Sequence, residues 1–302
     1  MDWQFEAVAG PYGGTAEGPV WDGEHVYFTH IPGNRIMKFD PRTGACSEFR
    51  SGTHSTNGLA LDAKGRLYGC QAGQYCIARF EPDGSVTQLP NILDGRRHNR
   101  PNDLAIDSKG RIWFSDPFGS HSPPEERQLD HASVLRLDPQ ADGNWTLQRM
   151  TFDTTSPNGV LLSQDERTLY VAESNYAGAR ELRAYPLNDD DTLGAYIVLH
   201  AFGQDHRGVH RGVDGMCLDT EGNVIATAGW CKAGPGPIVY VFTPSGRVLE
   251  THPAPMTGKS PEPKNCAFGD ADLSTLYVTT GNGQLFRVRN TGRRGWRLSG
   301  TL

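Results

Sequence analysis

The chain has 302 residues and a formal net charge of −6 at pH 7, which argues against general binding to nucleic acid. No apolar run approaches the roughly 18 residues that a membrane-spanning helix needs, and the N-terminus MDWQFEAVAG lacks the basic and apolar regions of a secretory signal. Glycine and proline account for 36 and 20 residues, which favours many short strands joined by tight turns. The six cysteines show no CxxC pair, so we expect free thiols. We therefore expect one globular domain over residues 1–302, in the cytoplasm, with no membrane or nucleic-acid partner.

One pattern recurs along the chain: a polar residue, an alternating apolar run, a turn rich in Asp and Gly, and a second apolar run. Such a pattern predicts a β-hairpin that begins at the polar residue. Six copies begin at Glu17, Asn57, Asn102, Asn158, Asp214 and Asn265. Their spacings of 40, 45, 56, 56 and 51 residues are typical of propeller blades.

A second hairpin follows each of these, with turns such as Asp-Pro, Pro-Asp-Gly and Pro-Ser-Gly. The second hairpins begin at Ile36, Ile77, Ser133, Leu182, Ile238 and Leu285. Two hairpins per copy give four antiparallel strands per blade, so the sequence predicts an all-β, six-bladed β-propeller. A strand near Trp3–Val8 is expected to add to the last blade and close the ring, which removes exposed sheet edges.

The residues that open the six copies, here called the lead residues, share one register. Because the first strand of each propeller blade lines the central channel, we expect the lead residues to project toward one end of it. All six are carboxylates or amides, and burying Glu17 and Asp214 together is costly unless their charges are compensated. A divalent cation would compensate them, with amide oxygens of Asn102 and Asn158 completing an all-oxygen shell for Ca²⁺, Mg²⁺ or Mn²⁺, and with Zn²⁺ as a further option. The alternatives are a metal that only braces the ring and a water-filled channel.

Each first hairpin returns to the same end of the ring, so the residues that close its second strand are expected to form a pocket wall. They are His30, Gln71, Asp116, Glu173 and Trp230. Among them His30, Asp116 and Trp230 are candidate substrate contacts, although Asp116 could instead support its neighbours and Trp230 could be a plain blade-end aromatic. Residues 117–132 form a connection long enough to act as a lid.

Five motifs, in order and at blade spacing, resemble those of the senescence marker protein / gluconolactonase / luciferin-regenerating enzyme family over essentially the whole chain. They are EGPVW at Glu17, RPND at Arg100–Asp103, FSDPFG at Phe114–Gly119, SPNG at Ser156–Gly159 and VDG at Val213–Gly215. RPND together with FSDPFG is most similar to the bacterial gluconolactonase branch. The resemblance implies a six-bladed propeller that hydrolyses lactones with one divalent metal.

By this resemblance Glu17, Asn158 and Asp214 hold the metal, and Asn102 ligates it or binds substrate beside it. Arg100 is implied as a substrate contact and Asp214 as the catalytic acid/base. We expect a metal-activated water to attack the carbonyl of a small lactone or ester, a sugar lactone such as an aldonolactone above all, with Asp214 as general base and Ca²⁺ as the favoured ion.

Two other functions are weighed against the lactonase. A phosphotriesterase or arylesterase could use the same site, with Asp214 as a nucleophile. The second alternative is a non-enzymatic interaction platform with a structural metal. The polar lead residues argue against this alternative. Further nucleophilic mechanisms find no support, because the sequence has no GxSxG motif and no cysteine at a lead position.

Overall fold

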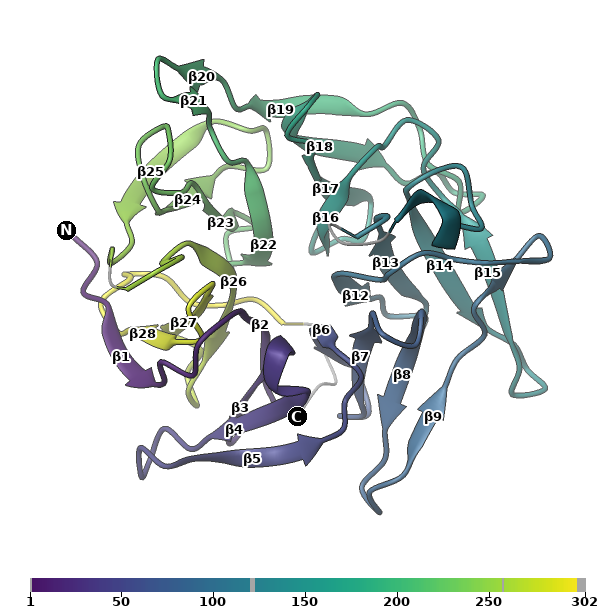
Figure 1. Ribbon diagram of the computed structural model, residues 1–302, viewed down its shortest axis with the longest axis horizontal. Helices are drawn as coiled ribbons and strands as arrows, with labels where there is room; N and C mark the ends of the chain where they lie inside the picture. Colours follow the sequence, from purple (N-terminus) through teal and green to yellow (C-terminus); the bar gives the residue numbers. More distant parts are fainter. Residues whose placement is uncertain (1, 120–122, 257, 298–302) are drawn as a thin grey trace.

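The computed structural model describes residues 2–119, 123–256 and 258–297. Six four-stranded antiparallel sheets follow one another around a common axis, as Figure 1 shows. The prediction of an all-β, six-bladed β-propeller is therefore confirmed. Within the described ranges there is no helix of the length and apolar character that crossing a membrane requires.

The first three blades follow chain order from the inner strand outward. Blade one contains β2 (Ala16–Trp21), β3 (Val26–His30), β4 (Arg35–Phe39) and β5 (Cys46–Ser51). Blade two contains β6 (Thr56–Leu61), β7 (Leu67–Gln71), β8 (Cys76–Phe80) and β9 (Val86–Gln88). Blade three contains β12 (Leu104–Ile106), β13 (Ile112–Asp116), β14 (Ser133–Pro139) and β15 (Trp145–Arg149).

The next two blades repeat this order, and the last one uses both ends of the chain. Blade four contains β16 (Pro157–Leu162), β17 (Thr168–Ser174), β18 (Arg180–Pro186) and β19 (Ile197–Ala201). Blade five contains β22 (Val213–Leu218), β23 (Val224–Ala228), β24 (Ile238–Phe242) and β25 (Val248–Pro253). Blade six contains β26 (Pro263–Gly269), β27 (Thr275–Thr280), β28 (Leu285–Val288) and β1 (Glu6–Ala9).

The N-terminal strand closes the ring as expected, because β1 pairs antiparallel with β28 in blade six (Figure 1). The strand begins three residues later than predicted. Trp3 instead packs outside the sheet, where its ring stacks on His252 of blade five with 3.9 Å between centroids.

Short elements of other kinds lie in the connections between these strands. Two of them are small hairpins in the Arg- and His-rich loops, formed by β10 (Ile92–Leu93) with β11 (Arg96–Arg97), and by β20 (Gln204–Asp205) with β21 (Gly208–Val209). The others are two 3₁₀ turns, η1 (Ile31–Gly33) and η2 (Pro124–Glu126).

The apolar core fills the spaces between neighbouring blades. One cluster joins Tyr170 and Leu182 of blade four to Met216 and Phe242 of blade five. Middle strands such as β17 are buried along nearly their whole length, since they have a blade on each face. Each fully buried Leu or Phe side chain contributes about 1.5–3 kcal/mol relative to an exposed one, so the ring is held mainly by contacts between blades.

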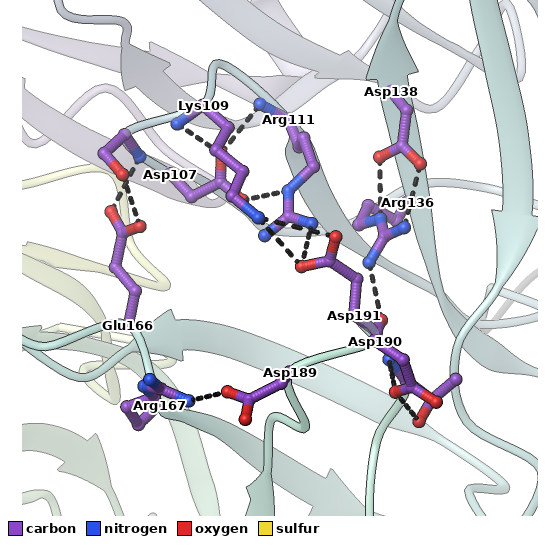
Figure 2. A network of polar contacts seen from close by, with 12 residues as sticks. Asp107, Lys109, Arg111, Arg136, Asp138, Glu166, Arg167, Asp189, Asp190 and Asp191 are labelled. Carbon is purple, nitrogen blue, oxygen red and sulfur yellow. Dashed lines mark hydrogen bonds and ion pairs between the residues drawn. The ribbon is translucent and has the colours of Figure 1, made fainter.

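Polar contacts join blades three and four at the end of the hairpins remote from the lead residues (Figure 2). Arg111 lies between two carboxylates, with Nε 2.6 Å from Asp107 Oδ2 and Nη1 2.6 Å from Asp191 Oδ1. Lys109 Nζ lies 3.0 Å from the same Asp191 oxygen. Because Arg111 and Asp107 are buried, these contacts fix the β12–β13 turn against the next blade.

Candidate functional site

In five of the six blades an irregularity in the inner hairpin lies beside the lead residue. The pairing register shifts beside the lead residue in β2, β6, β16, β22 and β26. In blade three, Asn102 lies just before β12, and its main-chain N–H donates to the Ser115 carbonyl oxygen at 2.9 Å. A bulge of this kind leaves a residue unpaired and bends the strand, which can turn a side chain out of the sheet toward the axis.

Glycines next to the lead residues allow neighbouring inner strands to approach closely. A Cβ on Gly58 would lie 2.5 Å from Asp103 Oδ1, and a Cβ on Gly159 would lie 2.2 Å from the carbonyl oxygen of Asp214. Both positions therefore exclude any larger residue. The main-chain N–H of Gly58 also donates to the Asn102 carbonyl oxygen at 2.8 Å, so the lead segments of blades two and three are in direct contact.

Asp214 is buried and pairs with two cations of the chain itself. Its Oδ2 contacts Arg211 Nη2 and lies 3.5 Å from Lys264 Nζ. Arg211 is buried as well, and its Nη1 donates to the carbonyl oxygens of Gly229 at 3.0 Å and Pro263 at 3.1 Å. Charge compensation at the lead residues thus comes partly from residues that flank the lead positions, which the sequence argument did not include.

Glu17 is buried without an ion pair among the described residues. Its Oε2 accepts a hydrogen bond from the main-chain N–H of Gly18 at 3.1 Å. Burial raises the pKa of Glu17 well above its usual range, and the nearby charges of Asp214 and, more weakly, Asp103 act in the same direction, whereas Lys264 and the hydrogen bond from Gly18 oppose the shift. The Glu17 carboxylate is therefore the oxygen group here that most requires a positive partner.

Asp103 adds a third carboxyl group that sequence reasoning missed. Burial raises its pKa to about 7, with a further contribution from Asp214, while hydrogen bonds from Leu104 and Asn265 oppose the shift. Asp103 Oδ2 lies 3.4 Å from Asn265 Nδ2. The sequence did contain a signal, because Asp103 stands where four other copies carry a glycine, namely Gly18, Gly58, Gly159 and Gly215.

An open, largely apolar pocket lies inside the ring next to Asp103. It is a cavity of about 230 Å³ to which the inner strands of all six blades contribute, together with Trp296 from the C-terminal segment. Its lining includes Asp103 and Asn265 as well as apolar residues such as Leu218 and Phe268. An apolar surrounding of this kind disfavours ionised carboxylates, in accord with the raised pKa values.

Several oxygens at the lead residues have no hydrogen-bond partner within the described residues. They include Asn57 Oδ1, which is buried, the side-chain amides of Asn102 and Asn158, and Asp214 Oδ1. Together with Glu17, these are carboxylate and amide oxygens, the donors that hard cations prefer. The donor set fits one divalent cation of the calcium type. No group of three or more His, Cys, Asp or Glu side chains is placed to hold a metal in the ranges that the structure describes, so Glu17, Asp103 and Asp214 do not form a three-carboxylate site and any cation here would also need amide oxygens.

Asp116, at the end of β13, holds the loop that leads to Asn102. Its Oδ2 accepts the main-chain N–H of Asn99 at 2.7 Å, and its Oδ1 accepts Nδ1 of the buried His98 at 2.9 Å. Both oxygens are thus occupied inside the protein, and the residue is 1% exposed. This geometry matches the supporting role considered for Asp116, while its contact with a substrate stays a prediction.

Glu173 and His30 occupy the corresponding ends of β17 and β3 and hold the loops before their own lead residues. Glu173 Oε1 accepts the main-chain N–H of Ser156 at 2.8 Å. His30 Nε2 donates to the Gly13 carbonyl oxygen at 2.7 Å, and its Nδ1 accepts Arg35 Nε at 3.2 Å. Both ring nitrogens of His30 are therefore engaged, and its predicted contact with substrate is likewise still a prediction.

Arg100 is partly exposed beside the long segment that was considered as a lid. Its Nη2 donates to the Tyr75 hydroxyl at 3.1 Å and lies 3.6 Å from Glu126 Oε2. Residues 120–122 of the predicted lid lie outside the described residues. The described remainder is fastened to β11, where the main-chain N–H of Arg97 donates to Gln128 Oε1 at 2.8 Å. Lid movement stays a prediction.

Trp230 forms an aromatic pair with Tyr176 across blades four and five. The two rings stack with 5.2 Å between centroids and 11° between planes. The Trp230 indole N–H donates to the Val209 carbonyl oxygen at 3.1 Å, and Lys232 Nζ lies 4.9 Å from the ring centroid. Tyr176 is 49% exposed, so the pair presents an aromatic surface to solvent. This surface lies just beyond the ends of β17 and β23.

Fold and site together define a six-bladed propeller whose carboxylates and amides gather at bulges around one end of the axis. The chain belongs to the SMP-30/Gluconolactonase/LRE-like family, whose sequence profile matches residues 15–282. It is 28% identical to a gluconolactonase of Zymomonas mobilis, over 91% of this chain and 78% of that protein. It is 27% identical to a 6-deoxy-6-sulfogluconolactonase of Pseudomonas putida, over 87% and 82%. The solved structure of a gluconolactonase from Xanthomonas campestris is 31% identical, with a TM-score of 0.78 over 95% of this chain and 89% of that one.

Proposed function

We propose that this protein is a lactonase that hydrolyses sugar lactones, with an aldonolactone as the favoured substrate. The observation that carries the proposal is the gathering of two buried carboxylates, Glu17 and Asp214, at one end of the propeller axis, beside lead amides such as Asn57, whose buried Oδ1 has no hydrogen-bond partner among the described residues. The relatives named gluconolactonase and 6-deoxy-6-sulfogluconolactonase support the same reaction class.

We also propose that the site holds one divalent cation, with Ca²⁺ favoured over Mg²⁺, Mn²⁺ and Zn²⁺. The residues that would hold it are Glu17, Asn102, Asn158 and Asp214, because their oxygens match the preference of hard cations. When bound, such a cation polarises a carbonyl group and stabilises negative charge on its oxygen.

Asp214 is proposed as the general base. Arg211 holds its Oδ2, which leaves Oδ1 to take a proton from the attacking water. The same oxygen then returns that proton to the ring oxygen as its bond to the carbonyl carbon breaks, and the products are a hydroxyl group and a carboxylic acid, which releases its proton to solvent. The buried Arg211 keeps the carboxylate oriented through this exchange.

Substrate contacts are proposed for residues at the mouth of the site. Arg100 has hydrogen-bond donors for hydroxyl or anionic groups, and the Trp230–Tyr176 stack offers an aromatic face for a sugar ring. Asn102 would bind substrate or cation. Asp116 and His30 are proposed to act mainly through the loops that they hold.

The test is acid release from gluconolactone above the spontaneous rate, followed by pH-stat titration. Metal-stripped protein should be inactive, and Ca²⁺, Mn²⁺ or Zn²⁺ should restore turnover. Full activity of the metal-stripped protein would show that the reaction does not need a cation, but it would still support lactonase activity. Turnover of aryl esters or phosphotriesters, with none of a lactone panel, would favour the alternative hydrolase on the same site.

A further inference from the structure

Lys264 lies on the bulge of β26, and it is less buried than the neighbouring cation Arg211. Both cations contact the same oxygen of Asp214. Arg211 has a side chain that is 5% exposed, and two main-chain carbonyl oxygens hold its Nη1. Moving it would leave a charge buried and unpaired, which is strongly unfavourable.

Lys264 is the more exposed of the two cations. Its side chain is 22% exposed, and an ammonium on a four-carbon stem can leave a carboxylate by rotating toward solvent. A second carboxylate is close, because Lys264 Cε and Glu262 Oε2 both border the point where a Cβ on Gly281 would stand, at 3.2 and 3.3 Å. The ammonium can therefore exchange Asp214 for water or Glu262.

We propose that Lys264 competes with the divalent cation for Asp214 and thereby sets the affinity of the site. The inference rests on the cation site of the proposed function. A divalent ion held by Asp214 would stand a few ångströms from the Lys264 ammonium, and two such positive charges repel in a site with little water. Cation binding therefore requires Lys264 to leave Asp214, whereas Arg211 stays and orients the carboxylate.

The test measures cation affinity directly, by isothermal titration calorimetry of Ca²⁺ into the metal-stripped full chain. Lys264→Met removes the charge and keeps the stem, and it should tighten Ca²⁺ binding on the order of tenfold. Lys232→Met is the matched control, because it removes the same charge near the mouth from a lysine that contacts Trp230 and not Asp214. The control should bind Ca²⁺ with the wild-type Kd.

Three results would overturn the inference. An unchanged or weaker Kd in Lys264→Met would show that Lys264 does not compete, while leaving the cation site intact. Equal tightening in Lys232→Met would assign the effect to overall charge. The third result is that neither wild type nor Lys264→Met shows binding heat or a rise in Tm with Ca²⁺, Mg²⁺, Mn²⁺ or Zn²⁺. That result would show that the cation site does not exist, and the proposed competition would fail with it.

Discussion

Asp116 and Asn99 are joined by a hydrogen bond of 2.7 Å, in which the main-chain N–H of Asn99 donates to Asp116 Oδ2. The other oxygen of Asp116 accepts His98 Nδ1, so one carboxylate at the end of β13 fixes two consecutive residues of the loop. Asn102 follows three residues later. The position of this lead residue therefore depends on a side chain from the neighbouring strand as well as on its own backbone.

We expect Asp116→Ala to release this loop. The main-chain N–H of Asn99 and the ring of His98 would lose buried acceptors, which costs about 1–3 kcal/mol for each unsatisfied group. Urea unfolding should report the loss of stability, and kcat/KM on gluconolactone should fall because Asn102 is no longer held. Asp130→Ala, which removes an exposed carboxylate of the following segment, should change neither quantity. Unchanged stability in Asp116→Ala would contradict the positioning role.

Asp214→Asn should lose turnover while keeping the fold. General acid–base catalysis by a positioned side chain typically contributes about 10²–10⁴-fold, so kcat should fall within that range. The amide oxygen of the variant can still accept a hydrogen bond from Arg211, and near-UV circular dichroism should therefore stay native. Retention of more than about a tenth of the wild-type kcat would rule out Asp214 as the base.

Asp103 gives the metal-stripped protein a stability that depends on pH. Its folded pKa of about 7 lies above the usual value of 3.8 for an aspartate, so the folded state binds more protons than the unfolded state between these values. The free energy of unfolding should therefore fall as pH rises from about 4 to 7, by up to about 4 kcal/mol from this group. Glu17, whose pKa is also raised, acts in the same direction.

Asp103→Asn isolates that contribution. The amide does not ionise, so the variant should gain stability relative to wild type as pH increases, and the two should differ least near pH 4. Urea unfolding in chelator at several pH values measures the difference. A constant difference between pH 4 and 8 would mean that Asp103 is ionised throughout this range in the folded protein.

Trp230→Ala should raise KM for sugar lactones more than it lowers kcat. If the indole packs on the sugar ring with about the energy of an aromatic pair, about 0.5–1.5 kcal/mol, its loss corresponds to a KM increase of roughly twofold to tenfold. Trp230→Phe keeps an aromatic ring, so its KM should lie between those of the wild type and Trp230→Ala. If KM is unchanged in Trp230→Ala, the indole is a structural aromatic without a part in substrate binding.

The sequence was sufficient for the architecture, because the hairpin pattern is local and repeats. Strand alternation and turn residues predict six copies of four strands, and the structure confirms them. The expectation of free thiols also agrees with the structure, in which all six cysteines are unpaired. The two hairpins β10–β11 and β20–β21 were not predicted, since each has only two residues per strand and no alternation to recognise.

The site was only partly accessible from sequence. The shared register of the lead residues indicated Glu17 and Asp214 as neighbours of the amides. The pairing of Asp214 with Lys264 joins residues 50 positions apart, and no local pattern reports such a contact. The bulges were equally hidden, because a register shift depends on how two strands meet. The loop-holding contacts of Asp116 and His30 depend on tertiary structure for the same reason.

The pairing of β1 with β28 has a consequence for biosynthesis. Residues 6–9 are synthesised long before their partner strand at residues 285–288. At about 5–20 residues per second, the N-terminal strand waits on the order of tens of seconds with an unpaired edge. Glu17 lies on β2, which contacts β26 in the closed ring, so the surroundings of Glu17 are complete only after residues 263–269 have been synthesised. A nascent chain would therefore hold five blades without a working site.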